Sequence, residues 1–423
     1  MPVLDKDSIP ALTALFLAFF ALKRPNIDAL QRWIPKSLAA WVMLVGLVAG
    51  AFLTVLTNDD RVGYLPGLRV YDGFSSVLGV MIQLIPFILA YRFLASPSQH
   101  RTLLMVLALA GLGYSLLALY EIRMSPQLNR MVYGFFPHDW IQHVRGGNFR
   151  PLVFLEHGLW LAIFFAMAAI AAVGASAAFP KQRTKLRLVA GWIFLTLLLS
   201  SSLGAAAIAF VLVPIVFFLP QRTQMLLALI IGTIVLTYPI LRERGWVTGD
   251  TAVSIAASIN ADRAGSLQFR LENEDILLQK ANQRPLFGWG GWGRARVYDE
   301  LGTDISVTDG YWVIIFGVGG WTRYLSEFGL MIAPLVFFYV RRKRYNVGPE
   351  TTTLTIVLCA NLIDLLPNAT MTPLTWLIAG ALWGRMDWKG NDGSDQHDPE
   401  ELVPVAVSPY TRQTKRIKRR QAI

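Results

Sequence analysis

The stretch Ser37–Leu56, SLAAWVMLVGLVAGAFLTVL, decides the fold because it contains no charged residue. A helix needs about 20 consecutive apolar residues to cross the hydrocarbon core of a bilayer. A helix packed on a soluble core would keep a polar stripe along its outer face, and this stretch has none. It therefore predicts a helix that crosses a membrane.

The rest of the chain repeats this composition. Hydrophobic residues make up 54% of its 423 residues and charged residues 16%, whereas a soluble domain carries about 25% charged residues. This excludes a soluble globular domain. Further apolar runs long enough to span are Phe74–Leu94, Leu103–Tyr120 and Leu152–Val173. We expect an all-α, polytopic transmembrane bundle.

The expected number of membrane spans depends on how two apolar runs are interpreted. Ile9–Leu22 is preceded by acidic residues as well as a lysine and is followed by no small-residue cleavage site, so we interpret it as a short first span. Leu186–Leu219 is too long for one span, and the segment Ser200–Gly204 interrupts it. The expected total is about eleven spans, with about ten or twelve as alternatives, because each needs a run of this length.

The basic residues predict the orientation. They cluster in alternate connections, at 23–36, 181–187 and 341–344, and again in the tail at 412–420. Such segments stay on the cytoplasmic side. The net charge of +11 is therefore an orientation signal, and no nucleic-acid partner is expected. We predict a bacterial inner-membrane protein with its N-terminus outside and its C-terminus in the cytoplasm.

Two long connections are then expected on the outer side, at 121–150 and 241–309, within a transmembrane domain at 1–389. The second has a helical apolar pattern, which predicts a helix near Ser266–Gln283. Residues 390–423 are polar and charged and predict a disordered, basic cytoplasmic tail. Cys359 lies inside an apolar run, where a small buried residue is the simplest interpretation.

The second outer connection and the helix after it contain short motifs. In chain order they are Ser266 and Arg270, the turn Pro285-Leu286-Phe287-Gly288-Trp289-Gly290, the pair Asp309-Gly310, and Gly317 with Gly320. In this respect the chain resembles the O-antigen ligase and polymerase superfamily of bacterial membrane glycosyltransferases. Members carry a Ser…Arg helix, a P-x-x-G-x-G turn, a polar motif that opens the next membrane helix, and a Gly-hydrophobic-x-Gly motif.

The chain departs from the pattern of that family in two places. Where ligases of the family have a histidine motif at the start of the helix, this sequence has Thr308-Asp309-Gly310. Where many members have Ser-Arg-Gly, it has Ser202-Leu203-Gly204. Both departures disfavour a ligase and leave a polymerase-like or divergent member of the superfamily as the interpretation.

The resemblance implies a donor glycan on a polyprenyl pyrophosphate carrier. Asp309, in the place of the histidine, is the expected catalytic base, since a carboxylate can accept a hydroxyl proton. Arg270 and Arg284 are expected to bind the substrate, because guanidinium groups form charge-assisted bonds to phosphate. Arg150 and His157, from the earlier outer connection, are expected to line the same cavity.

Simpler interpretations stand beside these. Asp309 can be only a helix N-terminal charge, and most of the arginines in the loop can be solvated or surface-paired. The tryptophans at 289, 292, 312 and 321 suit a membrane-interface belt. Arg323 and Glu327 are four residues apart on a helix and are expected to form a buried structural pair.

No cofactor is expected, and no metal either, because His138, His143 and His157 lack compact ligand spacing. The expected partners are the lipid bilayer, a polyprenyl-pyrophosphate-linked glycan and polysaccharide-export proteins. A transporter or flippase of lipid-linked glycans, or a non-catalytic membrane scaffold, are the alternative functions. The absence of a convincing internal repeat disfavours a transporter.

Overall fold

The computed structural model describes residues 8–21, 33–137, 139–145, 147–259, 261–345 and 347–388. Over these residues the chain is helical, apart from its loops and one small antiparallel hairpin of β1 (Val144–Arg145) and β2 (Asn148–Phe149). The predicted all-helical class is confirmed. The tail predicted at 390–423 lies outside the described residues.

Six of the described helices are long and apolar enough to cross a membrane. They indicate a membrane protein, as the composition predicts. These helices are α3 (Leu38–Leu56), α4 (Val70–Phe93), α5 (Pro97–Met124), α7 (Gly158–Ala178), α10 (Gln221–Glu243) and α13 (Tyr311–Val340).

The other five expected spans correspond to shorter helices. These are α1 (Ser8–Ala21), α8 (Arg183–Leu199), α9 (Leu203–Phe218), α15 (Pro349–Asp364) and α16 (Pro373–Asp387). They have 14 to 17 residues, and at 1.5 Å per residue a helix of that length is about 21–26 Å long. The hydrocarbon core is about 30 Å thick. The count of eleven spans therefore stays a prediction, although the helix break expected between Leu199 and Gly204 is present.

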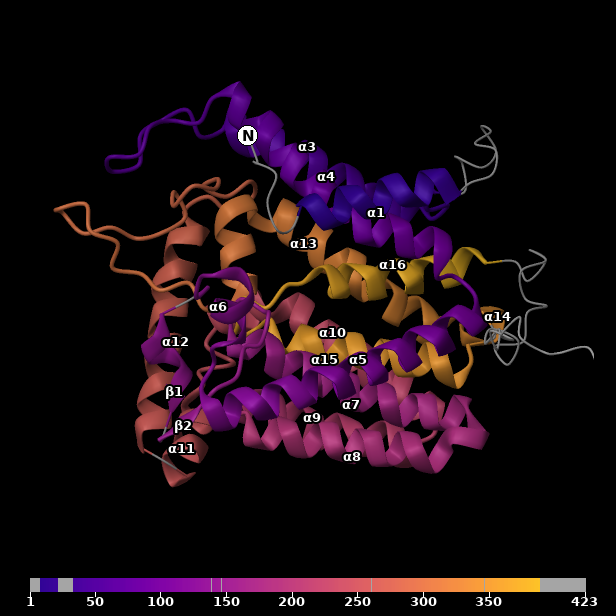
Figure 1. Ribbon diagram of the computed structural model, residues 1–423. Helices are drawn as coiled ribbons and strands as arrows, with labels where there is room; N and C mark the ends of the chain where they lie inside the picture. Colours follow the sequence, from indigo (N-terminus) through magenta and orange to yellow (C-terminus); the bar gives the residue numbers. More distant parts are fainter. Residues whose placement is uncertain are drawn as a thin grey trace, which may run out of the picture. The chain divides into compact units, whose positions relative to one another are not determined.

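The centre of the bundle is α7, which packs against α5, α8, α9 and α15 (Figure 1). Its sequence is rich in alanine, and 16 of its 21 residues are buried. Small side chains allow helix backbones to approach closely. Gly111 of α5 faces Ala168, and Gly174 faces Thr353 of α15, so added methyl groups at either glycine would separate the helices.

The start of α7 differs from the prediction. The apolar run begins at Leu152, but the helix begins only at Gly158. The buried carboxylate of Glu121 accepts the amide hydrogens of Leu152 and Val153 at 2.9 and 2.7 Å, and Val153 has a φ of 55°. These amides are held by a remote side chain rather than by a helix. His157 thus lies before the membrane helix and not within it.

The connection between α10 and α13 contains two helices, α11 (Asp250–Ile259) and α12 (Ala261–Asn282). A helix therefore exists where Ser266–Gln283 was predicted, while its side of the membrane stays a prediction. In Figure 1, α12 runs across the ends of α5, α7, α8 and α9. Two further short helices are α6 (Leu128–Tyr133) and α14 (Arg342–Tyr345).

Helix α13 is broken at Gly320, which has φ 61° and ψ −162°. The turn Pro285–Gly290, called here the docked turn, fills the break. Trp321 donates its amide hydrogen to the carbonyl of Pro285 at 2.7 Å, and Gly290 donates to Val318 at 2.9 Å. Backbone groups at the break are thus bonded, as buried backbone N–H and C=O groups require.

Candidate functional site

A cavity of about 260 Å³ lies where α12, the segment before α13, the start of α7 and the loop after α15 meet. We call it the Arg270 pocket. Its lining combines positive, negative and neutral polar groups. The lining residues are Gln142, Glu156, His157, Leu159, Trp160, Arg270, Thr308, Asp309, Asn368, Ala369 and Thr370. Three of the five predicted site residues, Arg270, Asp309 and His157, therefore share one cavity.

Arg270 and Asp309 form an ion pair across this pocket, with Nε 3.4 Å from Oδ2. The Arg270 side chain is 24% exposed and that of Asp309 is 30% exposed, so both remain accessible from the cavity. Nη1 of Arg270 donates to the carbonyl of Pro367 at 3.3 Å and to Oδ1 of Asn368 at 3.0 Å. These contacts use Nε and Nη1, and the guanidinium has further donors for a bound anion.

The loop after α15 is shaped by Asp364, which the sequence analysis did not single out. Its carboxylate accepts from Nδ2 of Asn368 at 2.9 Å and from the hydroxyl of Thr370 at 2.6 Å. Because Asn368 then contacts Arg270, this buried acid fixes the wall behind the guanidinium. The signal in the sequence that could have pointed to Asp364 is its position as an ionisable residue at the end of an apolar run.

His157 caps the N-terminus of α7. Its Nδ1 accepts the amide hydrogen of Leu159 at 3.1 Å, so the ring proton of the neutral imidazole is on Nε2. The ring also lies against that of His143, with 5.0 Å between centroids. His157 therefore contributes an imidazole ring, held by this cap, to the lining of the Arg270 pocket.

Arg150 and Arg284 are not among the residues lining this pocket. Arg150 is buried, and its Nη2 donates to the carbonyl of Ser201 at 3.2 Å in the turn between α8 and α9. Arg284 donates from Nη1 to Oδ1 of Asn58 and from Nη2 to Asp60, each at 2.6 Å. The structure therefore does not bring these two arginines to the Arg270 pocket.

Arg284 instead helps to hold the docked turn. Its guanidinium stacks on Trp289 at 4.4 Å from the ring centroid, and Lys280 covers the same ring at 3.6 Å. The hydroxyl of Thr54 in α3 donates to the carbonyl of Phe287 at 2.6 Å, and Nδ2 of Asn58, two residues after the end of α3, donates to the carbonyl of Gly288 at 2.9 Å. The P-x-x-G-x-G motif is thus an element that joins α3 to the break in α13.

The position of α12 is fixed by a second ionic cluster. Arg242, at the end of α10, pairs with Asp275 and donates to the carbonyl of Leu271 at 3.2 Å. Glu274 is buried, with Oε2 3.8 Å from Nε of Arg242. Burial raises the pKa of Glu274 to about 7, although Arg242 and the hydrogen bond from Trp312 oppose this shift.

The structure also bears on three of the simpler interpretations, those of Trp312, of the pair Arg323 and Glu327, and of Cys359. Trp312 is fully buried and donates from Nε1 to Glu274 at 3.4 Å, so the prediction that it joins an interface belt is wrong. A fixed carboxylate acceptor keeps its indole inside the protein. The predicted pair of Arg323 and Glu327 is confirmed at 3.2 Å, and Cys359 is buried as expected.

Among the described residues, no group of three histidine, cysteine, aspartate or glutamate side chains is placed to hold a metal ion. His138 lies outside those residues. In comparisons with known proteins, no family model and no curated protein matches the chain.

Proposed function

We propose that the protein is a membrane glycosyltransferase of cell-surface polysaccharide assembly. It transfers or polymerises glycan from a polyprenyl pyrophosphate carrier at the outer face of the bacterial inner membrane. The observation that supports this most directly is the Arg270 pocket, in which a guanidinium, a carboxylate and an imidazole N–H share one cavity.

Arg270 is the proposed diphosphate ligand. Its charge is balanced by Asp309 at 3.4 Å, and the carbonyl of Pro367 and the side chain of Asn368 fix its direction. A diphosphate offers shorter, bidentate bonds to the same guanidinium. The guanidinium thus stabilises charge on the departing lipid diphosphate without proton donation, and His157 lines the same cavity.

Asp309 is the proposed base. When the diphosphate engages Arg270, the carboxylate of Asp309 loses its ion-pair partner and is available to accept the acceptor hydroxyl proton. The acceptor oxygen then bonds to the anomeric carbon while the bond from that carbon to the phosphate oxygen breaks. The electron pair leaves with the lipid diphosphate, and the proton remains on Asp309.

Reconstitution in liposomes with polyprenyl-pyrophosphate oligosaccharides extracted from the source cells tests this proposal. Asp309→Asn is expected to lower glycan transfer by about a hundredfold or more, the scale of general base catalysis. Arg270→Ala and Arg270→Lys are both expected to impair it, since lysine lacks the bidentate fork. Arg296→Ala is the matched control, because Arg296 pairs with Asp304 at a more exposed position of the same connection.

The same vesicles separate the alternatives. Movement of labelled lipid-linked glycan across the bilayer without chain growth or transfer would identify a transporter or flippase. If Asp309→Asn and Arg270→Ala both leave glycan transfer at the level of the unmodified protein, the proposed site is wrong.

A further inference from the structure

A second cavity adjoins the Arg270 pocket and leads toward α1. It has a volume of about 350 Å³ and is lined by polar groups such as Gln83 and Thr372 as well as by apolar ones. Trp160 lines both cavities. Met371 and Thr372 follow Thr370 directly in the chain, so the two cavities also share one stretch of wall. We call this second cavity the middle pocket.

A third cavity, of about 670 Å³, lies along α1, is open to the surface and has an almost wholly apolar lining. Ser8 and Ala11 line the middle pocket, whereas Leu12, Leu15 and Phe19 line this third cavity, called here the α1 pocket. Residues spaced by three and four positions lie on one face of a helix. Ser8, Leu12, Leu15 and Phe19 therefore share one face of α1, and the two cavities meet this helix at the consecutive residues Ala11 and Leu12.

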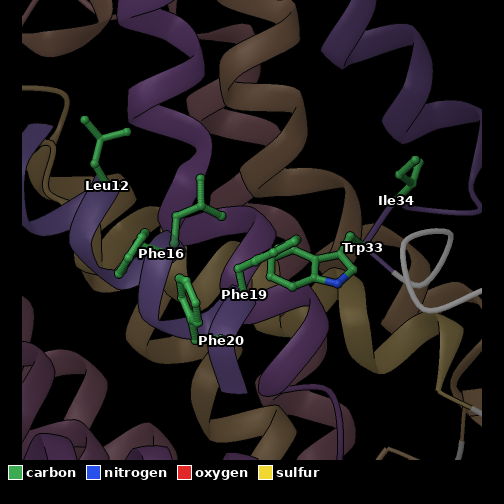
Figure 2. Close-up of a pocket in the computed structure, with 7 residues that line it drawn as sticks. Leu12, Phe16, Phe19, Phe20, Trp33 and Ile34 are labelled. Carbon is green, nitrogen blue, oxygen red and sulfur yellow. The ribbon is translucent and has the colours of Figure 1, made fainter. Parts of the chain in front are cut away.

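Figure 2 shows Leu12, Phe16, Phe19 and Phe20 along α1, with Trp33 from the following segment on the same cavity. From Ser8 to Phe20 the helix rises roughly 18 Å, at 1.5 Å per residue. Polarity falls along this path, from the ion pair in the Arg270 pocket, through the mixed middle pocket, to the apolar α1 pocket. This gradient matches a lipid with a charged head group and a long hydrocarbon chain.

We propose that the middle pocket and the α1 pocket together bind the polyprenyl chain of the lipid whose phosphate group occupies the Arg270 pocket. The inference rests on the proposed function, which supplies the class of lipid. Its own support is the wall shared by the first two cavities, the adjacency of Ala11 and Leu12 on α1, and the order of polarity of the three cavities. Ordinary bilayer lipid fills an apolar surface without needing a connection to a charged cavity at one end.

The head group and the chain are then recognised by different elements. Arg270 belongs to α12, and the chain-binding face belongs to α1. A substitution on α1 is expected to weaken the binding of lipids with long chains and to leave the binding of small phosphates unchanged. Ala11 is the most informative position, because a large side chain there obstructs the path between the middle pocket and the α1 pocket.

Binding of undecaprenyl phosphate, geranyl phosphate and inorganic pyrophosphate to the purified full chain, measured by native mass spectrometry in detergent, tests the proposal. Ala11→Trp is expected to lower the affinity for undecaprenyl phosphate by about tenfold or more, since each buried methylene group contributes roughly fourfold in affinity. Binding of the two small probes is expected to stay unchanged. Leu17→Trp is the control, because Leu17 is 61% exposed and lines neither cavity.

Phe19→Ala provides a second variant at the far end of the path and is expected to weaken only the long-chain probe. If Ala11→Trp and Phe19→Ala both bind undecaprenyl phosphate like the unmodified chain, the α1 path holds ordinary lipid and the inference is wrong. Failure of the proposed function gives a different result: pyrophosphate binding that does not depend on Arg270, as measured with Arg270→Ala.

Discussion

Glu274 shows how strongly one residue can couple this site to pH. It lies on α12 one turn from Arg270, and it is buried against Arg242 and Trp312. Because its pKa is about 7 in the folded protein, its side chain is half protonated near neutral pH. The contribution of this carboxyl group to the free energy of unfolding therefore differs below and above that pH.

The sign of the effect follows from proton binding. The ordinary pKa is 4.5 and the folded value is about 7, so between these values the folded protein holds a proton that the unfolded chain releases. The stability contributed by this group is complete below pH 4.5 and is lost as the pH rises through about 7.

We therefore expect Glu274→Gln to flatten the fall in melting temperature between those pH values, because glutamine cannot ionise. The effect corresponds to about 3 kcal/mol at most, given 1.36 kcal/mol per pKa unit. Thermal unfolding in detergent across this range measures it. Glu272→Gln, at an exposed position of the same helix, is the control. Equal pH slopes for Glu274→Gln and the unmodified chain would contradict the assignment.

Motif spacing was enough to bring attention to Arg270 and Asp309. His157, which shares their pocket, was singled out instead as an ionisable residue next to an apolar run. Motif spacing did not find Asn368, because its importance comes from its contact with Arg270 of α12, almost a hundred positions earlier in the chain. It did not find Asp364 either, because Asp364 acts through Asn368. It also did not show that Arg284 holds the docked turn, since its partners at Asn58 and Asp60 are remote in sequence.

Among the elements, α13 depends on the docked turn. Gly320 has a backbone conformation that is essentially restricted to glycine, and a Cβ atom there would lie 2.4 Å from the carbonyl oxygen of Pro285. Gly288 faces the same contact from the other side, where an added Cβ would lie 2.5 Å from the backbone of Val318. The helix break and the turn therefore form one unit.

Gly320→Ala is expected to destabilise the protein by about 1–3 kcal/mol from backbone strain alone, with displacement of the docked turn in addition. The melting temperature in detergent should fall. Gly191→Ala in α8 is the matched control, because nothing lies within 4 Å of an added Cβ there. A melting temperature for Gly320→Ala equal to that of Gly191→Ala would show that the turn does not constrain the break.

Apolar runs predicted that these helices exist, but they did not predict where all of them begin. The start of α7 depends on Glu121, a residue of α5 whose carboxylate bonds the amides of Leu152 and Val153. A hydropathy profile reflects only the side chains along the chain. It therefore contains no information on a hydrogen-bond acceptor that is remote in sequence. The break at Gly320 is likewise determined by the carbonyl groups of another segment.

For the molecule as a whole, the distribution of lysine and arginine predicts on which side of the membrane each connection lies. In a chain with Cys359→Ser, Leu301→Cys is expected to react with an impermeant maleimide in intact cells, because Leu301 is 91% exposed in the connection predicted to lie outside. Ser408→Cys in the predicted cytoplasmic tail is expected to react only after the cells are lysed. The opposite labelling pattern would reverse the orientation.

The docked turn has a consequence for biosynthesis. The ribosome completes Pro285–Gly290 before it completes Gly320, so the carbonyl groups that receive the amides of Trp321 and Thr322 already exist when the second half of α13 emerges. Thr54 of α3 and Asn58 just after it, which hold the turn, are translated earlier still. Each partner is therefore available to the nascent chain before the break that needs it enters the membrane.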